Sequence, residues 1–169
     1  MSGNKETPLS GGCQCGQIRY VLKDKPTDPG ICHCRMCQKA SGGPFMAFMG
    51  VPRASLVWTR GTPAVFRSSS VSERSYCADC GTPLTYCFLE GDEISVQIYT
   101  LDNPSAVGQP AREIGTESRA TWLDDINTFP GKTTEEEAGS DFMNACINFQ
   151  HPDYDTPEDW TPPEQEASS

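Results

Sequence analysis

Seven of the nine cysteines in this 169-residue chain fall into three short groups, and these groups constrain its fold more than any other feature. They are a C-x-C pair at 13 and 15, a C-x-C-x2-C cluster at 32–37 and a C-x2-C pair at 77 and 80. The chain shows no apolar leader and no run of about 18 apolar residues, so we expect no membrane span and a reducing, cytoplasmic location. Clustered thiols in such a compartment bind metal more often than they pair as disulfides.

The spacing of the cysteines predicts how they divide between metal ions. In an extended strand, residues two apart point to the same face, so Cys13 and Cys15 can present both sulfurs to one ion. In the C-x2-C pair the chain must turn tightly around the ion, and Gly81, which follows this pair, permits backbone N–H groups to approach the sulfurs. Two such pairs would complete a closed, four-thiolate site of the structural zinc type.

This division leaves Cys32, Cys34 and Cys37 as a second set of ligands. Three protein ligands with an open fourth position are the arrangement of catalytic zinc. The alternative is that both sites are closed by protein ligands, so that an eighth ligand comes from elsewhere in the chain. The candidates for that ligand are His33, His151, Cys87 and Cys146.

We expect none of these four residues to be a ligand. If residues 32–34 are extended, His33 points away from its two cysteine neighbours, which predicts a position behind the ligands or on the surface. His151 lies in an acidic, polar stretch and is expected to be solvated. Cys87, and Cys146 if its segment docks, are expected to be small buried hydrophobic residues.

The apolar residues between the cysteine groups predict β-strands. Residues 17–22 and 93–101 alternate between apolar and polar, and residues 44–51 form the continuous apolar run typical of a buried strand. Gly and Pro separate these segments, and no long amphipathic helix precedes residue 126. We therefore expect a mainly β body of short antiparallel strands, stapled by metal and containing few short helices.

Charge is distributed unevenly along the chain, whose formal net charge is −10. Residues 1–126 hold 12 Lys+Arg and 13 Asp+Glu, whereas residues 127–169 hold one Lys and ten Asp+Glu. This acidic, Pro-rich extension is predicted to be largely disordered, so deleting residues 150–169 should change stability little. Segment 141–149 is the exception, because Phe142, Cys146 and Phe149 have helical spacing, with which the segment could dock on the body. The chain has no basic patch of the size that nucleic-acid binding requires.

The cysteine groups lie within longer stretches that occur in the order GGCQCGQIRY, CHCRMCQKASGG and ERSYCADCGTPL. Together with SRATWLDD and FPG in residues 118–131, they resemble the glutathione-dependent formaldehyde-activating enzyme family, whose domain centromere protein V shares. The resemblance covers residues 8–131 as one domain and leaves the extension at 132–169 outside it. It implies an Mss4-like fold of antiparallel β-sheets around a structural zinc.

The resemblance also implies ligands and an activity. The implied ligands of the structural zinc are Cys13, Cys15, Cys77 and Cys80. The implied ligands of the second, catalytic zinc are Cys32, Cys34 and Cys37. The implied reaction is the reversible condensation of glutathione with formaldehyde to S-hydroxymethylglutathione, which is classed as a carbon–sulfur lyase reaction.

An anionic thiol such as glutathione needs local cations for its carboxylates, because the two thiolate-ligated zinc sites would themselves be negatively charged. Lys39 follows Cys37 by two residues and is the predicted substrate-binding residue. The alternative to an enzyme is a zinc-stabilised thiol- or protein-binding module without chemistry, which the same fold permits.

Loss of a ligand should have different consequences in the two sets. Cys77→Ser should unfold or strongly destabilise the body, because structural zinc contributes on the order of 10 kcal/mol to the folding of small zinc domains. Cys37→Ser should keep the fold and lose thiol binding. Thermal melts and zinc analysis measure both effects, with two ions per chain expected before substitution. Equal losses of melting temperature would contradict the division.

Overall fold

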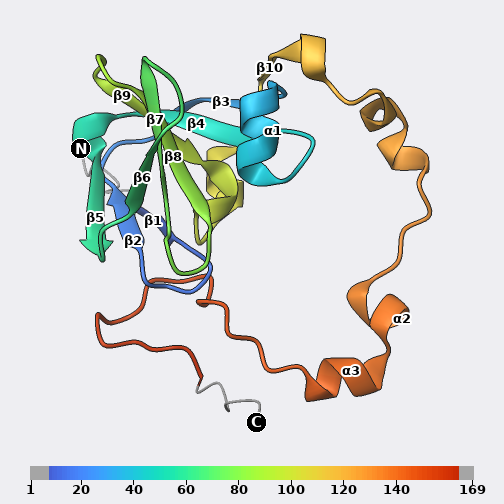
Figure 1. Ribbon diagram of the computed structural model, residues 1–169. Helices are drawn as coiled ribbons and strands as arrows, with labels where there is room; N and C mark the ends of the chain where they lie inside the picture. The colour runs from blue at the N-terminus through green and yellow to red at the C-terminus, as the bar shows by residue number, and fades with distance from the viewer. Residues whose placement is uncertain (1–7, 164–169) are drawn as a thin grey trace, which may run out of the picture.

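The computed structural model describes residues 8–163, and within them ten strands form two sheets (Figure 1), which confirms the mainly β prediction. The smaller sheet is antiparallel and has the order β1 (Leu9–Gly12), β2 (Arg19–Leu22), β5 (Leu56–Arg60). The larger sheet has the order β10 (Arg112–Ile114), β3 (Thr27–Cys32), β4 (Met46–Pro52), β9 (Glu93–Gln97), β8 (Pro83–Phe88), β7 (Ser72–Tyr76), β6 (Ala64–Arg67). Its pairs are antiparallel except for β10 and β3, which are parallel.

The helices of the described residues are short. The α-helices are α1 (Arg35–Ser41), α2 (Thr134–Ala138) and α3 (Ser140–Ala145). The 3-10 helices are η1 (Arg53–Ser55), η2 (Ile98–Thr100), η3 (Pro104–Val107), η4 (Thr116–Ser118) and η5 (Thr121–Thr128). None of the helices between residues 8 and 163 has the length and apolar character that crossing a membrane requires.

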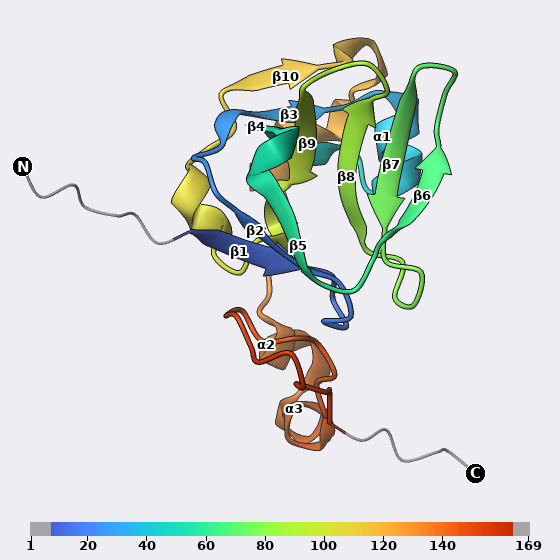
Figure 2. The same ribbon diagram turned by 90° about the vertical axis from the view of Figure 1, so that its left-hand side faces the viewer.

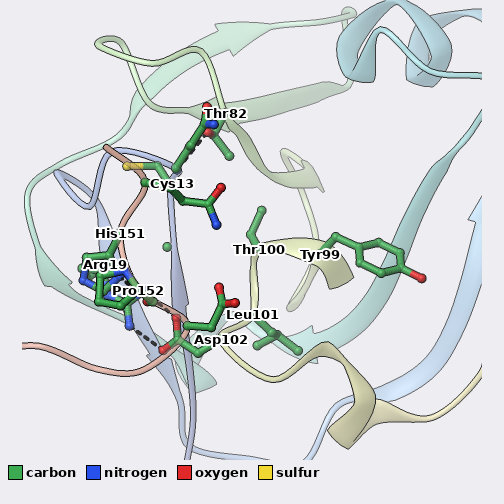
Figure 3. A pocket seen from close by; sticks show the side chains of 13 residues that line it. Cys13, Arg19, Thr82, Tyr99, Thr100, Leu101, Asp102, His151 and Pro152 are labelled. Carbon is green, nitrogen blue, oxygen red and sulfur yellow. Dashed lines mark hydrogen bonds and ion pairs between the residues drawn. The ribbon is translucent and has the colours of Figure 1, made fainter. Parts of the chain in front are cut away.

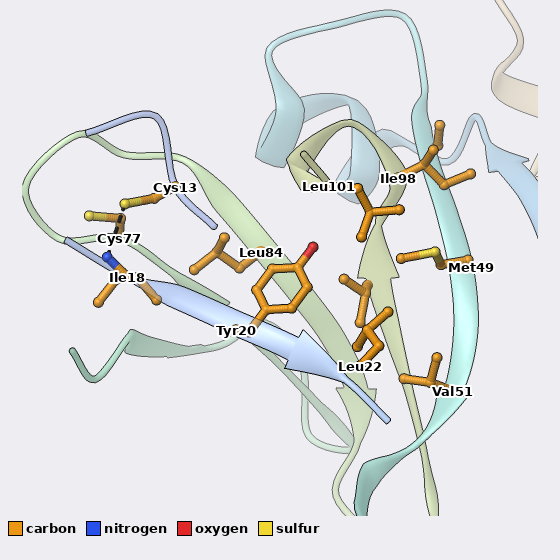
Figure 4. Packing of buried hydrophobic residues seen from close by; sticks show 12 residues of the cluster. Cys13, Ile18, Tyr20, Leu22, Met49, Val51, Cys77, Leu84, Ile98 and Leu101 are labelled. Atoms are coloured by element: carbon orange, nitrogen blue, oxygen red, sulfur yellow. Dashed lines mark hydrogen bonds between the residues drawn. The ribbon is translucent and has the colours of Figure 1, made fainter. Parts of the chain in front are cut away.

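The hydrophobic core lies between the two sheets (Figures 2 and 4). Tyr20 and Leu22 project from β2, while Met49 and Val51 project from β4, and each of the four is at most 1% exposed. The predicted strand at 93–101 ends earlier, at Gln97, because the chain enters η2 there, yet Ile98 of η2 and Leu101 after it are still buried in the same core. The alternation of apolar and polar residues at 17–22 correctly predicted β2, which buries Tyr20 and Leu22 in the core.

The register of the larger sheet gives its two faces different roles. Met49 of β4 lies opposite Val96 of β9, and both are fully buried in the core. The adjacent pair, Phe48 and Gln97, must project from the opposite face, because successive residues of a strand alternate. That second face carries the cavity described below.

Residues 129–149 leave the body as a wide arc that carries α2 and α3 (Figure 1). Segment 141–149 does not dock on the body: Phe142, Met143 and Ile147 are between 43% and 65% exposed, and Cys146 is also exposed. The helical spacing of the segment is not realised, because α3 ends at Ala145 and the later apolar residues do not continue its face.

Residues 150–160, which we call the C-terminal clasp, return to the body and pack on the turn between β1 and β2. His151 was expected to be solvated, but it is only 4% exposed. Its backbone N–H donates to the Gln14 carbonyl at 2.7 Å, its Nε2 lies 2.8 Å from Thr156 Oγ1, and its ring lies 4.6 Å from that of Trp160. Gly16 makes room for both rings, since a Cβ there would lie 2.5 Å from His151 and 2.7 Å from Trp160.

Two arginines of the body bind the clasp. Arg19 is 2% exposed and donates to both oxygens of Asp102 at 2.8 and 2.5 Å (Figure 3). It also pairs with Asp155 of the clasp at 3.2 Å. Burial opposes the ionisation of Asp102, but the hydrogen bonds from Arg19 and Ser10 hold its pKa below the usual value. Arg60 donates to the Thr156 carbonyl at 3.1 Å.

The expectation of a disordered extension is therefore wrong for the clasp. Carboxylate and carbonyl groups of the clasp accept hydrogen bonds from Arg19 and Arg60. The composition of the extension does not reveal these contacts. Residues 164–169 of the predicted extension lie outside the described residues.

Removing the clasp contacts should cost stability. The double variant His151→Ala/Trp160→Ala should lower the free energy of unfolding by about 3 kcal/mol. It removes both rings that pack on Gly16 and the hydrogen bond between the His151 ring and the Thr156 hydroxyl. Phe142→Ala on the arc, where the side chain is 55% exposed, is the control and should change it by less than about 0.5 kcal/mol. Denaturant unfolding gives both values. An equally small effect of the two variants would show that the clasp is not packed in solution.

Candidate active site

The first cluster contains the four cysteines of the predicted structural set. The Sγ atoms of Cys13, Cys15, Cys77 and Cys80 lie within 4.8 Å of one another. The separations are 3.5 Å between Cys13 and Cys15 and 3.7 Å between Cys15 and Cys77. Four sulfurs bound at about 2.3 Å around a tetrahedral zinc ion are roughly 3.8 Å apart. The donor set and its spacing therefore fit zinc.

Both halves of this cluster lie in hairpin turns. The C-x-C pair follows β1 and precedes β2, and the C-x2-C pair lies between β7 and β8, so the cluster joins the two sheets. The C-x-C pair was expected to be extended, but the chain turns there, with Gly16 donating to the Cys13 carbonyl at 3.1 Å. Gly81 adopts φ +77 and donates to the Cys77 carbonyl at 2.9 Å, so it closes its turn instead of directing its N–H at a sulfur.

Hydrogen bonds prepare the sulfurs of this cluster to act as ligands. The Ile18 N–H donates to Cys13 Sγ at 3.2 Å, and the Thr82 hydroxyl lies 3.2 Å from Cys80 Sγ. Burial opposes the ionisation of Cys80, but the hydroxyl and backbone of Thr82 lower its pKa to about 6. The same hydroxyl accepts from the Gln14 N–H at 3.1 Å, which links the two turns. Ligand orientation is thus supported by neighbouring donors.

The second cluster contains Cys32, Cys34 and Cys37, whose sulfurs also lie within 4.8 Å of one another. Cys32 ends β3, Cys34 is the residue before α1, and Cys37 lies on the first turn of that helix. Burial raises the pKa of Cys32 to about 12. For Cys34 burial also raises the pKa, but hydrogen bonds from the backbone N–H groups of Cys37 and Met36 and from the neighbouring thiols together outweigh it, so the pKa is lowered. Within residues 8–163, no other His, Cys, Asp or Glu joins this group. The protein thus offers three sulfurs here and four in the first cluster.

None of the alternative ligands lies in either cluster. His33 is 1% exposed and lies behind the second cluster, with Nε2 3.7 Å from Glu113 Oε1. His151 belongs to the clasp, and Cys87 is buried on β8, as predicted. Cys146 lies exposed on the arc.

The strand β10 holds the three-cysteine loop in place. Ile114 lies opposite Cys32, and its carbonyl accepts from the His33 N–H at 2.9 Å. Gly115 follows with φ +67, and a Cβ there would lie 2.6 Å from the backbone nitrogen of Cys34. The Gly115 backbone therefore packs directly against the three-cysteine loop, and the contact leaves no room for a side chain at residue 115.

A cavity of about 480 Å³ opens beside the second cluster, on the face of the larger sheet that points away from the core. Directly paired residues share a face, so the registers place Cys32 with Met46 and Phe48 with Gln97 on this side. Gly50 has no side chain to fill the floor. The other lining residues are Cys34, Met36, Cys37, Arg74, Tyr86, Cys87, Phe88, Glu93, Ile94, Ser95, Arg112, Ile114 and Gly115.

The cations of this cavity differ from the one predicted. Lys39 lies exposed on α1 and is not among the residues that line the cavity. Arg74 of β7 and Arg112 of β10 line it instead, and Arg112 lies 5.2 Å from the centroid of the Phe48 ring. The sequence offered both arginines only as two of several available cations and did not single them out, because they lie far along the chain from the cysteines that they approach.

The fold is mainly β, one cysteine cluster lies where the two sheets meet, and another lies beside a cavity. These features define a class of protein with two candidate metal centres. Within that class, the chain belongs to the glutathione-dependent formaldehyde-activating enzyme family, whose model matches residues 8–118. The resemblance inferred from the cysteine-containing stretches is thereby confirmed.

The chain is also similar to two other proteins. An uncharacterized lyase of Schizosaccharomyces pombe is 31% identical over 81 residues, which are 48% of this chain and 58% of the relative. The chain thus spans less than two thirds of that lyase. The crystal structure of a Rhodobacter sphaeroides protein matches with a TM-score of 0.50 and 19% identity over 62% of this chain and 98% of the other, which supports the fold alone.

Gly115→Ala should weaken metal binding at the three-cysteine cluster by about tenfold or more and spare the other cluster, because its Cβ would collide with the Cys34 backbone. Gly108→Ala is the matched control: its φ is similarly positive, +75, but a Cβ there meets nothing within 4 Å. Zinc transfer to a chromophoric chelator should show two classes of site and a selective change in one. Equal behaviour of the two variants would assign the effect to backbone strain alone.

Proposed function

We propose that this protein is a zinc-dependent carbon–sulfur lyase that reversibly condenses a thiol, glutathione, with formaldehyde or a related aldehyde. The observation that carries the proposal is the set of three cysteines, without a fourth ligand in the described residues, at the wall of a cavity that contains two arginines. Membership of the family and the relative named as a lyase support it at the family level. Because its thiols must stay reduced, we place the protein in the cytoplasm.

Zinc is the metal that this donor set favours, since soft thiolates in tetrahedral sites select it. Cys32, Cys34 and Cys37 would hold the catalytic ion, and Cys13, Cys15, Cys77 and Cys80 the structural ion. When bound, the catalytic ion would supply the positive charge that ionises a thiol whose free pKa is about 8.5.

The cavity residues would bind and orient the thiol compound. Arg112 offers a planar guanidinium group, and such groups bind carboxylates through two parallel hydrogen bonds. Phe48, Tyr86 and Ile94 line the same space and exclude water from the reacting atoms. In the reaction a sulfur–carbon bond forms, the π bond of the aldehyde carbonyl breaks, and the thiol proton ends on the former carbonyl oxygen. No further reactant is required.

The size of the cavity favours a thiol larger than the aldehyde. Its volume of about 480 Å³ lies within the range of roughly 300–1,000 Å³ that small-molecule sites occupy. Formaldehyde has only two heavy atoms, so most of this space would receive the thiol compound. A peptide thiol with carboxylates matches Arg112, and the mainly apolar walls suit its aliphatic parts.

Calorimetry should show that glutathione binds more tightly than mercaptoethanol and releases close to one proton near neutral pH. Arg112→Gln should narrow the difference in affinity between glutathione and mercaptoethanol by about tenfold, because it removes a cation that can bind a glutathione carboxylate. Lys39→Ala, outside the cavity, is the control and should change little. High salt should also narrow the difference, as it does for partly exposed charge pairs.

Formaldehyde is then added, and adduct formation is followed against the uncatalysed rate. Thiol binding without rate enhancement would contradict the enzyme and leave a thiol-binding module. An absence of both thiol binding and proton release would show that the three-cysteine cluster is closed. A large effect of Lys39→Ala on the preference for glutathione would favour Lys39 as the substrate-binding residue, as the sequence predicts.

A further inference from the structure

Arg74 is a buried cation without a carboxylate partner in the described part of the chain. It lies in the middle of β7 and is 7% exposed, and none of the ion pairs found within residues 8–163 includes it. Burying an uncompensated charge is costly, so a buried guanidinium needs an anionic or strongly polar partner. The contacts of Arg74 show where that partner is.

The guanidinium of Arg74 contacts two sulfurs and one aromatic ring. Nη2 lies 3.3 Å from Cys37 Sγ, Nη1 lies 3.6 Å from Met46 Sδ, and Cζ lies 4.8 Å from the centroid of the Tyr86 ring. A thioether accepts hydrogen bonds weakly, and the ring offers a cation–π contact. Of these three partners, only Cys37 becomes an anion, since a thiol that coordinates a metal ion is deprotonated.

The sheet register explains why Arg74 reaches this cysteine. Arg74 pairs with Phe66 of β6 and Tyr86 of β8, so its side chain leaves the sheet on the face of the cavity. Cys37 lies on α1 and lines the same cavity as Arg74. The contact therefore joins the sheet to the three-cysteine loop, and the two residues are separated by 37 positions in the chain.

A charge-assisted N–H···S bond withdraws negative charge from the sulfur that accepts it. Three thiolates already make their metal ion electron-rich, and a fourth, incoming thiolate adds to that charge. A guanidinium on Cys37 offsets part of it and also holds the sulfur in one orientation. Both effects favour acceptance of a fourth anionic ligand.

We propose that Arg74 is a positioning residue that acts through Cys37 and enables the three-cysteine cluster to accept an external thiolate. The inference rests on the proposed metal binding at that cluster, but it does not require reaction with an aldehyde. It concerns the affinity of the open position itself, which is separate from the recognition of substrate carboxylates by Arg112.

The test uses the full chain loaded with Co²⁺, whose sulfur-to-metal charge-transfer band reports on the thiolate ligands. The band is recorded without thiol and during titration with mercaptoethanol, which has no carboxylate that Arg74 could bind directly. Arg74→Gln should shift the band in the absence of thiol and weaken mercaptoethanol binding by about tenfold, the lower end of effects found for partners of metal ligands. Arg74→Lys keeps the charge but loses the planar fork, so it should recover part of the affinity.

Arg67→Gln is the control, because it makes the same change at an arginine of the neighbouring strand β6 that does not line the cavity and donates to the Ser69 and Ser70 carbonyls. It should leave the band and the mercaptoethanol affinity as they are. Cobalt in the four-cysteine cluster should contribute equally to all spectra, so difference spectra report on the three-cysteine cluster.

An unchanged band and an unchanged mercaptoethanol affinity in Arg74→Gln would overturn the proposal. A loss confined to glutathione would overturn it as well, and would assign Arg74 to carboxylate binding. If Arg74→Gln does not fold, Arg74→Lys decides by the same two measurements. If the unsubstituted chain binds no thiol, the proposed function fails, while the shift of the thiol-free band still tests the contact between Arg74 and Cys37.

Discussion

The structure depends on one cluster of four cysteines at which two hairpin turns meet. The turn between β1 and β2 and the turn between β7 and β8 each contribute two cysteines to one cluster, so an ion held there would tie the smaller sheet to the larger one. The strands are short, and only 36% of the residues are apolar, so hydrophobic burial has limited area to act on. The clasp strengthens the same place, because it covers Gly16 in the first of the two turns.

The packing of the two sheets also determines where the second site forms. With one face of the larger sheet covered by the smaller sheet, the other face is free to carry the cavity. On β4 the two roles alternate residue by residue: Met49 faces the core and Phe48 faces the cavity. Rigid strands therefore hold both the arginines and the end of β3 from which the three-cysteine loop begins, which is the kind of support that precise ligand positioning needs.

The candidate site was only partly predictable from the sequence. The division of seven cysteines into sets of four and three follows from their spacing, since pairs one or two residues apart can turn toward one ion, and the structure brings together the same two sets. The cations were not predictable in this way. Lys39 is close to Cys37 in the chain but outside the cavity, whereas Arg74 reaches Cys37 through strand register, which local spacing does not encode.

The sequence by itself determined the strand-rich class, the cysteine sets and the family resemblance, because alternation and ligand spacing are local properties. Only the tertiary structure decided the fate of the acidic extension. Composition predicts disorder there, yet His151 and Trp160 fill the notch that Gly16 leaves, and Arg19 and Arg60 find partners in the clasp. These contacts join residues more than 90 positions apart, so neither partner's own neighbourhood in the chain signals them. Buried arginines need acceptors wherever the fold can supply them, and in this protein a segment of the acidic extension supplies them.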